Sequence, residues 1–286
     1  SREPVDGVGV VGARNVILDH LSVSWSVDEA LSVTHGADLV TVQWCFITES
    51  LHDSFHPDGN HGFGSLISGD RISWHHCLYA HHRSRNPSPG DVTLDFVNNV
   101  IFDWGSRCGV SDDVPLAMNY VGNSLRPGPS TSGAARALAF WAGGLDQRIF
   151  VGANVMSNGP ATQAELIVTP PSVDPVAARD LILLDAPLDL SEITTTDAET
   201  ARDAVLSFGG ATLPRRDAVD ARVARQAEIG TGRHIDSQDE VGGWPSLEAG
   251  VAPPDGDGDG MPDAWEAEHG FDPASAADGP GDSDGG

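Results

Sequence analysis

Basic residues are scarce in this chain, and lysine is absent. The 286 residues include 42 Asp and Glu against 16 basic residues, all of them Arg, which gives a formal net charge of −26. Binding to nucleic acid needs clustered cations that neutralise phosphates, so this composition argues against a nucleic-acid partner. An acidic surface is instead compatible with binding of calcium, which prefers carboxylate oxygens.

Long apolar runs are also lacking, and there are only three cysteines. No stretch of 18 apolar residues occurs, so the sequence predicts no membrane span. Cys45 and Cys77 could approach each other across adjacent strands, but we favour buried free thiols, and Cys108 has no partner in either case. No signal peptide is recognisable, and we expect the first turns of the fold to precede residue 1.

A β-rich segment, in contrast, is repeated several times. When the copies are aligned, one column contains Leu21, Cys45, Cys77, Asn99, Asn123 and Asn154, at spacings of 22 to 32 residues. No single copy can bury its apolar face, so the copies must stack. The sequence therefore predicts an all-β fold, a right-handed parallel β-helix (a solenoid), with an internal asparagine ladder. A β-sandwich is the alternative, but sandwiches rarely repeat such a column.

The composition changes twice along the chain, which predicts three parts. We expect a β-helix catalytic domain over residues 1–160, a partly helical segment packed on it over 161–250, and an Asp/Gly-rich calcium-binding module over 251–286. In the middle part, the capping-box pattern Thr196–Glu199 predicts a short helix that ends near Gly209. A second helix is expected over 217–228, with Gly230 as its stop.

The tail contains a twelve-residue pattern typical of an EF-hand-like calcium loop. Gly260 stands at position 6, where the loop turns sharply. The predicted metal ligands are Asp255, Asp257, Asp259, the Met261 carbonyl, Asp263 and Glu266. An acidic linker is the alternative, although linkers do not fix Gly and Glu at these positions. Asp282 and Asp284 resemble the start of a second loop that is cut off.

Histidines gather in the first part of the chain. Nine of the 11 His lie between His20 and His82, and four of them share a short segment with Arg83 and Arg85. No tight zinc-ligand spacing such as His-Glu-x-x-His occurs, so a zinc hydrolase is not favoured. Carboxylates early in the chain offer a better metal site, because oxygen ligands from consecutive turns can meet on one face of the solenoid.

Several motifs together resemble the pectate lyases of polysaccharide lyase family 1. The resemblance rests on Asn15-Val-Ile-Leu-Asp-His20, His75-His76 followed by Arg85-Asn-Pro87, Val97-Asn-Asn-Val100, Arg126-Pro-Gly-Pro-Ser-Thr131 and the stretch from Gly230 to Pro245. It covers nearly the whole chain. It implies a right-handed parallel β-helix that cleaves uronate-containing, pectate-like polysaccharide by calcium-assisted β-elimination. A secreted monomer with an acidic polysaccharide as partner and Ca²⁺ as cofactor is implied as well.

The resemblance also implies roles for individual residues. Arg85 matches the arginine regarded as the base that takes the proton at C5 of the uronate, and Arg83, His61 and His82 are expected to contact substrate. Asp6 and Asp28 match calcium ligands, and Glu29 is expected to replace a second acid that is Ser32 here. Because Arg is a poor base at its ordinary pKa, Arg85 as charge stabiliser with a His as base stays open.

Departures from the family pattern keep two other functions open. Asp58 stands where relatives often carry a lysine, and Ser88 stands where an Arg is common. These losses favour a non-catalytic carbohydrate-binding or adhesion solenoid, whereas the intact Arg85-Asn-Pro favours a lyase. A polygalacturonase-like hydrolase would need paired acids on neighbouring turns, for which only Asp112–Asp113 is a candidate in the middle turns. The lyase is the favoured hypothesis.

Overall fold

A computed structural model describes residues 5–171, 173–246 and 250–279 of the chain. The chain forms two compact units, Ser1–Pro245 and Ser246–Gly286. The larger unit contains the strands and three α-helices, and the smaller one contains a single short α-helix among its described residues. Within the part of the chain that the structure describes, no helix has the length and apolar character needed to cross a membrane.

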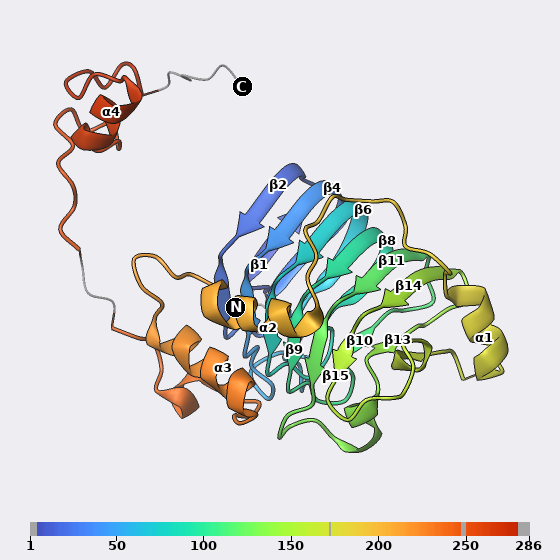
Figure 1. Cartoon of the computed structure of the whole chain (residues 1–286). Helices are drawn as coiled ribbons and strands as arrows, with labels where there is room; N and C mark the ends of the chain where they lie inside the picture. The colour runs from blue at the N-terminus through green and yellow to red at the C-terminus, as the bar shows by residue number, and fades with distance from the viewer. Residues whose placement is uncertain (1–4, 172, 247–249, 280–286) are drawn as a thin grey trace. The chain divides into compact units, whose positions relative to one another are not determined.

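The larger unit is a coil of parallel strands (Figure 1). Its first sheet comprises β1 (Val8–Val11), β2 (Arg14–Asp19), β4 (Leu31–Gln43), β6 (Leu66–His75), β8 (Ser88–Val97), β11 (Leu116–Val121) and β14 (Gln147–Gly152). The second sheet comprises β3 (Ser22–Ser24), β5 (Phe46–Thr48), β7 (Leu78–Ala80), β9 (Val100–Phe102), β12 (Ser124–Arg126) and β15 (Val155–Met156). The third comprises β10 (Gly109–Val110), β13 (Phe140–Trp141) and β16 (Ile167–Val168).

Consecutive turns of the chain pair in register in each sheet. Met118, for example, pairs with Leu94 on one side and with Ile149 on the other, although these residues are more than 20 positions apart in sequence. Such stacking gives a parallel β-helix, and twisted parallel strands favour the right-handed crossover. The predicted fold class is therefore confirmed.

The predicted column of residues is a continuous internal ladder. The backbone N–H of Cys77 donates to Asn99 Oδ1 at 3.0 Å, that of Asn99 to Asn123 Oδ1 at 2.9 Å, and that of Asn123 to Asn154 Oδ1 at 2.9 Å. Gln163 Oε1 extends the ladder by accepting from the backbone of Asn154. Each side-chain amide thus satisfies a backbone donor at a bend where no sheet partner is present, which confirms the asparagine ladder.

The bends between the first and second sheets require a left-handed backbone. Immediately before the ladder column, φ is positive at His20, Trp44, His76, Asn98, Gly122 and Ala153. Only Gly122 in this set lacks a side chain, so the other five accept a conformation that non-glycine residues usually avoid. The same bend is repeated because stacking over-determines it in every turn.

Apolar side chains fill the interior of the coil. Trp74, Tyr79, Phe96 and Tyr120 are fully buried, and Phe96 stacks on Tyr120 with ring centroids 5.5 Å apart. The three cysteines are buried free thiols, as predicted.

Three helices pack on the coil after the last strands. Helix α1 (Pro175–Ile182) contacts β14 and places Ile182 in the main core. This helix was not predicted. Helices α2 (Ala198–Phe208) and α3 (Ala218–Ile229) cover the outer side of the second sheet, where Val205 and Val223 pack on Phe46 and Phe102. Figure 1 shows α2 in front of that sheet.

Both predicted helices are present, with one correction. Helix α2 begins after Asp197, not Thr196: the Asp197 carboxylate accepts from the backbone N–H groups of Glu199 and Thr200. An aspartate one position later is the better cap because its charge also favours the helix N-terminus. Helix α3 ends at Gly230, which adopts the left-handed conformation with φ of 80°, as predicted.

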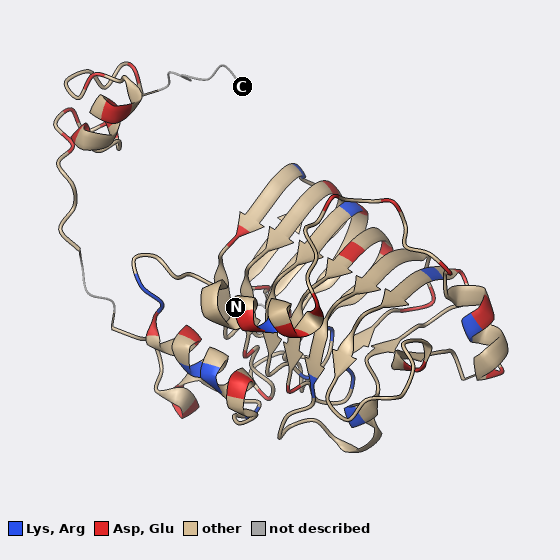
Figure 2. Cartoon of the chain, viewed as in Figure 1, with Lys and Arg blue, Asp and Glu red and all other residues tan. Residues whose placement is uncertain are grey.

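The smaller unit is built differently. Its helix α4 (Asp263–His269) follows Pro262, which makes no side-chain cap. None of the three apolar core clusters found among the described residues includes a residue of this unit. The unit has eleven Asp and Glu and neither Lys nor Arg, and Figure 2 shows the acidic residues along its described loops.

Candidate functional site

A cluster of carboxylates lies at the first turns of the coil. Asp6 precedes β1, and Asp28 and Glu29 precede β4. The N–H of Gly7 donates to the carbonyl of Glu29 at 3.0 Å, and this backbone pairing brings two turns together. One oxygen from each of the three carboxylates lies within 4.8 Å of the others.

The arginine of the Arg-x-Pro motif joins this cluster. Arg85 donates from Nη1 to Glu29 Oε1, and its guanidinium lies 4.1 Å from the centroid of the Phe63 ring. Glu29, Phe63 and Ser84 form successive bridges of one parallel stack, so three turns of the coil position the pair. Glu29 is only 4% exposed, and its charge is compensated by the Arg85 cation.

Burial and the neighbouring carboxylates have opposite effects on the pKa of Arg85. Burial lowers the pKa of the Arg85 guanidinium, whereas the carboxylates of Asp28, Asp112 and Asp6 act in the opposite direction. Burial also raises the pKa of Asp6, and a hydrogen bond from Ser32 partly offsets this. Ser32 thus lies beside the cluster without adding a carboxylate, and Glu29 is the third acid.

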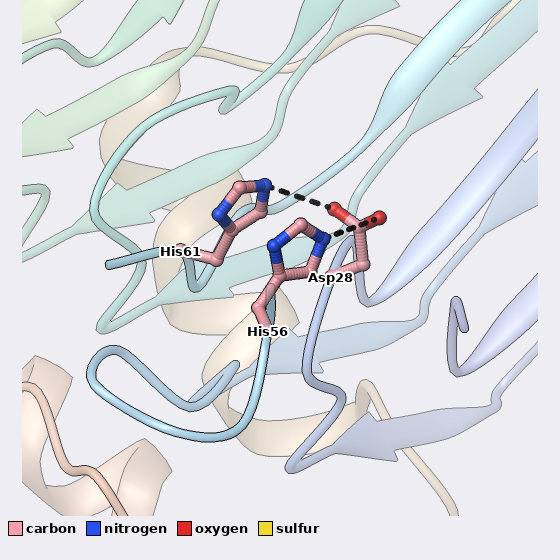
Figure 3. Close-up of side chains that lie close together, drawn as sticks. All are labelled: Asp28, His56 and His61. Carbon is pink, nitrogen blue, oxygen red and sulfur yellow. Dashed lines mark ion pairs between the residues drawn. The ribbon is translucent and has the colours of Figure 1, made fainter. Parts of the chain in front are cut away.

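Two histidines extend the site from Asp28 (Figure 3). His56 Nε2 lies 3.5 Å from Asp28 Oδ2, His61 Nε2 lies 3.7 Å from Asp28 Oδ1, and the two rings stack with centroids 3.4 Å apart. His61 Nδ1 faces the carbonyl of Gly59 at 3.3 Å and must donate to it, so in the neutral ring Nε2 carries a lone pair. This lone pair faces the Asp28 carboxylate, and a cation between the two groups would remove their repulsion.

This grouping of histidines was not predicted. His56 and His61 lie in one loop, between β5 and β6, and close around an acid from the preceding turn. Their spacing of five residues is not a recognised ligand motif, so the sequence offered no signal. Only the return of the loop onto Asp28 brings the three side chains together.

The two remaining predicted substrate contacts lie in different surroundings. Arg83 donates from Nη1 to the carbonyl of Asn60 and so ties the loop that carries His61 to the coil. His82 is fully buried: its Nε2 donates to the carbonyl of Ile47 at 2.8 Å, and burial lowers its pKa to about 3. A neutral core histidine cannot contact an external polysaccharide, so the prediction for His82 is corrected to a packing role.

A second group of carboxylates lies in the smaller unit. Asp257, Asp259 and Glu266 come together as the loop motif predicts, and Asp278, which was not predicted, joins them. One oxygen from each of the four lies within 4.8 Å of the others. Burial, followed by the charges of the neighbouring aspartates, raises the pKa of Glu266 to about 7.

The remaining predicted loop residues are not in that group. Asp255 accepts from the backbone N–H groups of Gly258 and Gly260, and Asp263 accepts from that of Gly256 at 2.6 Å. Met261 donates its own N–H to Asp259 Oδ1 at 2.8 Å. These residues shape the loop, and their role as metal ligands stays a prediction. Asp282 and Asp284 lie outside the described residues.

Comparison with known proteins gives a consistent set of relatives. No family model matches the chain. A probable pectate lyase C from Aspergillus flavus is 33% identical over 282 residues, which is 95% of this chain, and the protein of the same name from Aspergillus oryzae is 32% identical. The chain spans 63% of the length of these two relatives.

Two solved structures are similar at low sequence identity. The major allergen from cedar pollen is 13% identical with a TM-score of 0.49, and the similarity covers 72% of this chain and 56% of that one. A pectate lyase from Bacillus sp. N165, solved in complex with trigalacturonate, is 16% identical with a TM-score of 0.46 and covers 71% and 62%.

Proposed function

We propose that the β-helix unit cleaves a uronate-containing, pectate-like polysaccharide by calcium-assisted β-elimination. The observation that carries the proposal is the juxtaposition of the Arg85 guanidinium with the carboxylates of Asp6, Asp28 and Glu29. The names of the curated relatives, probable pectate lyases C, support the same activity. We further propose that the protein acts outside the cell as a monomer.

The carboxylate cluster fits a calcium ion. All three donors are oxygens, and calcium takes six to eight oxygen ligands from flexible sites. Asp6, Asp28 and Glu29 would hold the ion, and their number leaves room for a carboxylate of the substrate. When bound, calcium neutralises the uronate carboxylate and so makes the adjacent C5 proton more acidic.

The reaction needs one base and breaks two bonds, C5–H and C4–O. The base takes the proton from C5, the electrons of that bond form a double bond between C4 and C5, and the glycosidic oxygen leaves C4 with its bonding electrons and takes a proton from water. Arg85 lies at the cluster that would hold the uronate carboxylate, and burial already lowers its pKa. We therefore assign Arg85 either the proton transfer or the stabilisation of the negative charge that develops beside it.

The alternative base is a histidine, and burial distinguishes the two candidates, His61 and His82. His82 is buried and neutral, whereas the side chain of His61 is 15% exposed and faces Asp28. His61 would act through the Nε2 lone pair that faces the cluster. The choice between Arg85 and His61 therefore becomes a comparison of two variants.

The test is a kinetic assay with polygalacturonate and calcium, in which ultraviolet absorbance of the unsaturated product reports elimination. Arg85→Ala is expected to lower kcat at least about 100-fold, since it removes the base or the main stabilising charge. Arg85→Lys should restore little, because lysine lacks the planar fork that pairs with a carboxylate. Arg225→Ala, which removes an exposed ion pair with Glu228, is the matched control and should keep parental turnover.

The same assay separates the competing functions. A polysaccharide-binding solenoid would retain the polymer on an affinity gel but form no unsaturated product in the parent protein. A hydrolase would release reducing ends without ultraviolet absorbance. Parental turnover in Arg85→Ala, together with a large loss in His61→Ala, would transfer the base role to His61.

A further inference from the structure

The smaller unit contains buried carboxylate oxygens that have no partner. Glu266 is 0% exposed, yet neither of its oxygens accepts a hydrogen bond. Asp257 Oδ2, Asp259 Oδ2 and Asp278 Oδ1 are also buried without a partner. Burying a charged oxygen without a partner is costly, so these groups need a cation.

The other oxygen of each aspartate is used to shape the backbone. Asp257 Oδ1 accepts from the N–H of Asp259 at 3.3 Å, and Asp259 Oδ1 accepts from that of Met261 at 2.8 Å. Asp278 Oδ2 accepts from the N–H of Asp272 at 2.7 Å. Each aspartate thus uses one oxygen for the backbone and keeps the other unpartnered, and one oxygen of each lies within 4.8 Å of one oxygen of Glu266.

Nothing else in this unit can supply the missing positive charge. Residues 246–286 contain neither Lys nor Arg, and in Figure 2 the described part of this unit carries red segments and no blue ones. The single histidine, His269, donates to the carbonyl of Trp265 and stacks on its ring. The free oxygens number five if both oxygens of Glu266 are included, which approaches the six to eight that calcium takes.

We propose that Asp257, Asp259, Glu266 and Asp278 bind one calcium ion, and that Asp278 joins from outside the twelve-residue loop to close the unit around it. Asp278 lies eight residues beyond Gly270, the C-cap of α4, so the ion links the loop, the helix and the segment that follows. Because this small unit contributes to none of the apolar core clusters of the described residues, the ion is its main source of stability. This site is independent of the proposed lyase activity.

The position of Gly279 supports the proposal that the segment after α4 packs against the loop. A Cβ atom added to Gly279 would lie 2.7 Å from Asp259 Oδ2, so the backbone after Asp278 contacts a ligand of the loop. Glycine at this position lets the segment reach the ion. In contrast, Asp272 is exposed, and its side chain accepts only from the N–H of Ala274 at 3.2 Å.

The experiment is limited proteolysis of the full chain over a calcium titration, with cleavage within residues 250–279 followed by mass spectrometry. All variants carry Asp28→Asn, which removes the other candidate calcium site. The parent should become protected as calcium rises, because an ion that binds only the folded unit stabilises it. Asp278→Asn should need at least about tenfold more calcium for half-protection, since it loses one charged ligand.

Asp272→Asn is the matched control, because it removes the same charge six residues away and should titrate within about twofold of the parent. Magnesium should protect only at much higher concentration, since its octahedral shell suits this irregular set of carboxylates poorly. Equal midpoints for Asp278→Asn and the parent, or protection of the parent without any divalent cation, would overturn the proposal. Loss of protection in Asp278→Asn at all calcium concentrations supports it only if Asp272→Asn behaves like the parent; an equal loss in both variants would refute it.

Discussion

The two units of this chain are stabilised by opposite means. The β-helix unit buries aromatic and aliphatic side chains and satisfies its interior polar groups with amides, as in the ladder from Asn99 to Asn154. The smaller unit buries carboxylates around Glu266 and contributes to none of the apolar clusters in the described residues. Stacked turns can supply their own partners, whereas a short acidic segment depends on a cation from outside.

The difference also explains how acids are used in the two units. In the β-helix unit, buried Glu29 pairs with Arg85 and buried Glu49 with Arg222, and the buried Asp103 Oδ2 lies 2.7 Å from His81 Nδ1. In the smaller unit, Glu266 is buried with no arginine available. The charges of Glu29 and Glu49 are therefore compensated by the protein itself, whereas no arginine compensates Glu266.

Removing one ladder amide should cause the largest loss of stability, and the loss should be confined to the β-helix unit. Asn123→Ala deletes the acceptor for both the backbone N–H and the side-chain amide of Asn99. Because these donors are fully buried, we expect the free energy of unfolding of the β-helix unit to fall by about 2–4 kcal/mol. Urea unfolding followed by circular dichroism measures this loss.

Its control is Gln43→Ala, which removes a solvent-accessible contact with Asp19 and should cost less than about 0.5 kcal/mol. Calcium-dependent protection of the smaller unit should be the same in both variants. If Asn123→Ala altered that protection, the two units would not be independent and the comparison would fail.

Asp220 gives a pH-dependent effect of intermediate size. Its pKa is raised to about 6, mainly by burial; the hydrogen bond from Ser22 and the charge of Arg216 lower the pKa, and the charge of Asp217 raises it. A raised folded-state pKa means that the folded protein binds the proton more tightly, so this contribution to stability is present below about pH 4 and is lost as the pH rises through about 6. Asp220→Asn lacks this titration.

We therefore expect the stability of the parent to fall relative to Asp220→Asn by about 1–3 kcal/mol between pH 4 and about pH 6.5. Thermal unfolding of both proteins across this range measures the difference. A constant difference over the whole range would show that Asp220 is not the titrating group.

A helix cap should give the smallest effect. Asp197→Ala removes the acceptor for two backbone N–H groups at the start of α2 and should cost about 0.5–2 kcal/mol. Asp203→Ala, which breaks only an exposed pair with Arg202, is the control and should stay within about 0.5 kcal/mol. Equal losses in the two variants, measured by urea unfolding, would show a charge effect in place of a cap.

Much of the β-helix could be predicted from local patterns. The repeated column identified Cys77, Asn99 and Asn123 as equivalent positions because each turn of the coil presents the same bend to its neighbours. Gly230 was recognised as a helix stop because a left-handed residue is needed there. Each of these features depends on residues near in sequence or repeated at a regular interval.

The candidate sites are formed by residues that are distant in sequence and meet only in the folded protein. Sequence motifs identified Asp6, Asp28 and Arg85 as a set, and the stacking of three turns explains why they meet. The same motifs assigned His82 to substrate, but only the packing of neighbouring turns determined that its ring faces the core. Whether a side chain faces the core or the solvent depends on the packing of neighbouring turns, and the sequence of one turn does not specify that packing.

The sequence by itself determined the repeated turns, the amide ladder and three of the four clustered carboxylates of the smaller unit, Asp257, Asp259 and Glu266. The tertiary structure alone decided that His56 and His61 gather at Asp28 and that Asp278 reaches the calcium loop from beyond helix α4. The physical reason is the range of the interactions. Contacts between neighbouring turns recur at a regular interval and are therefore visible as a repeat in the sequence. A loop that folds back onto a distant residue produces no such repeat.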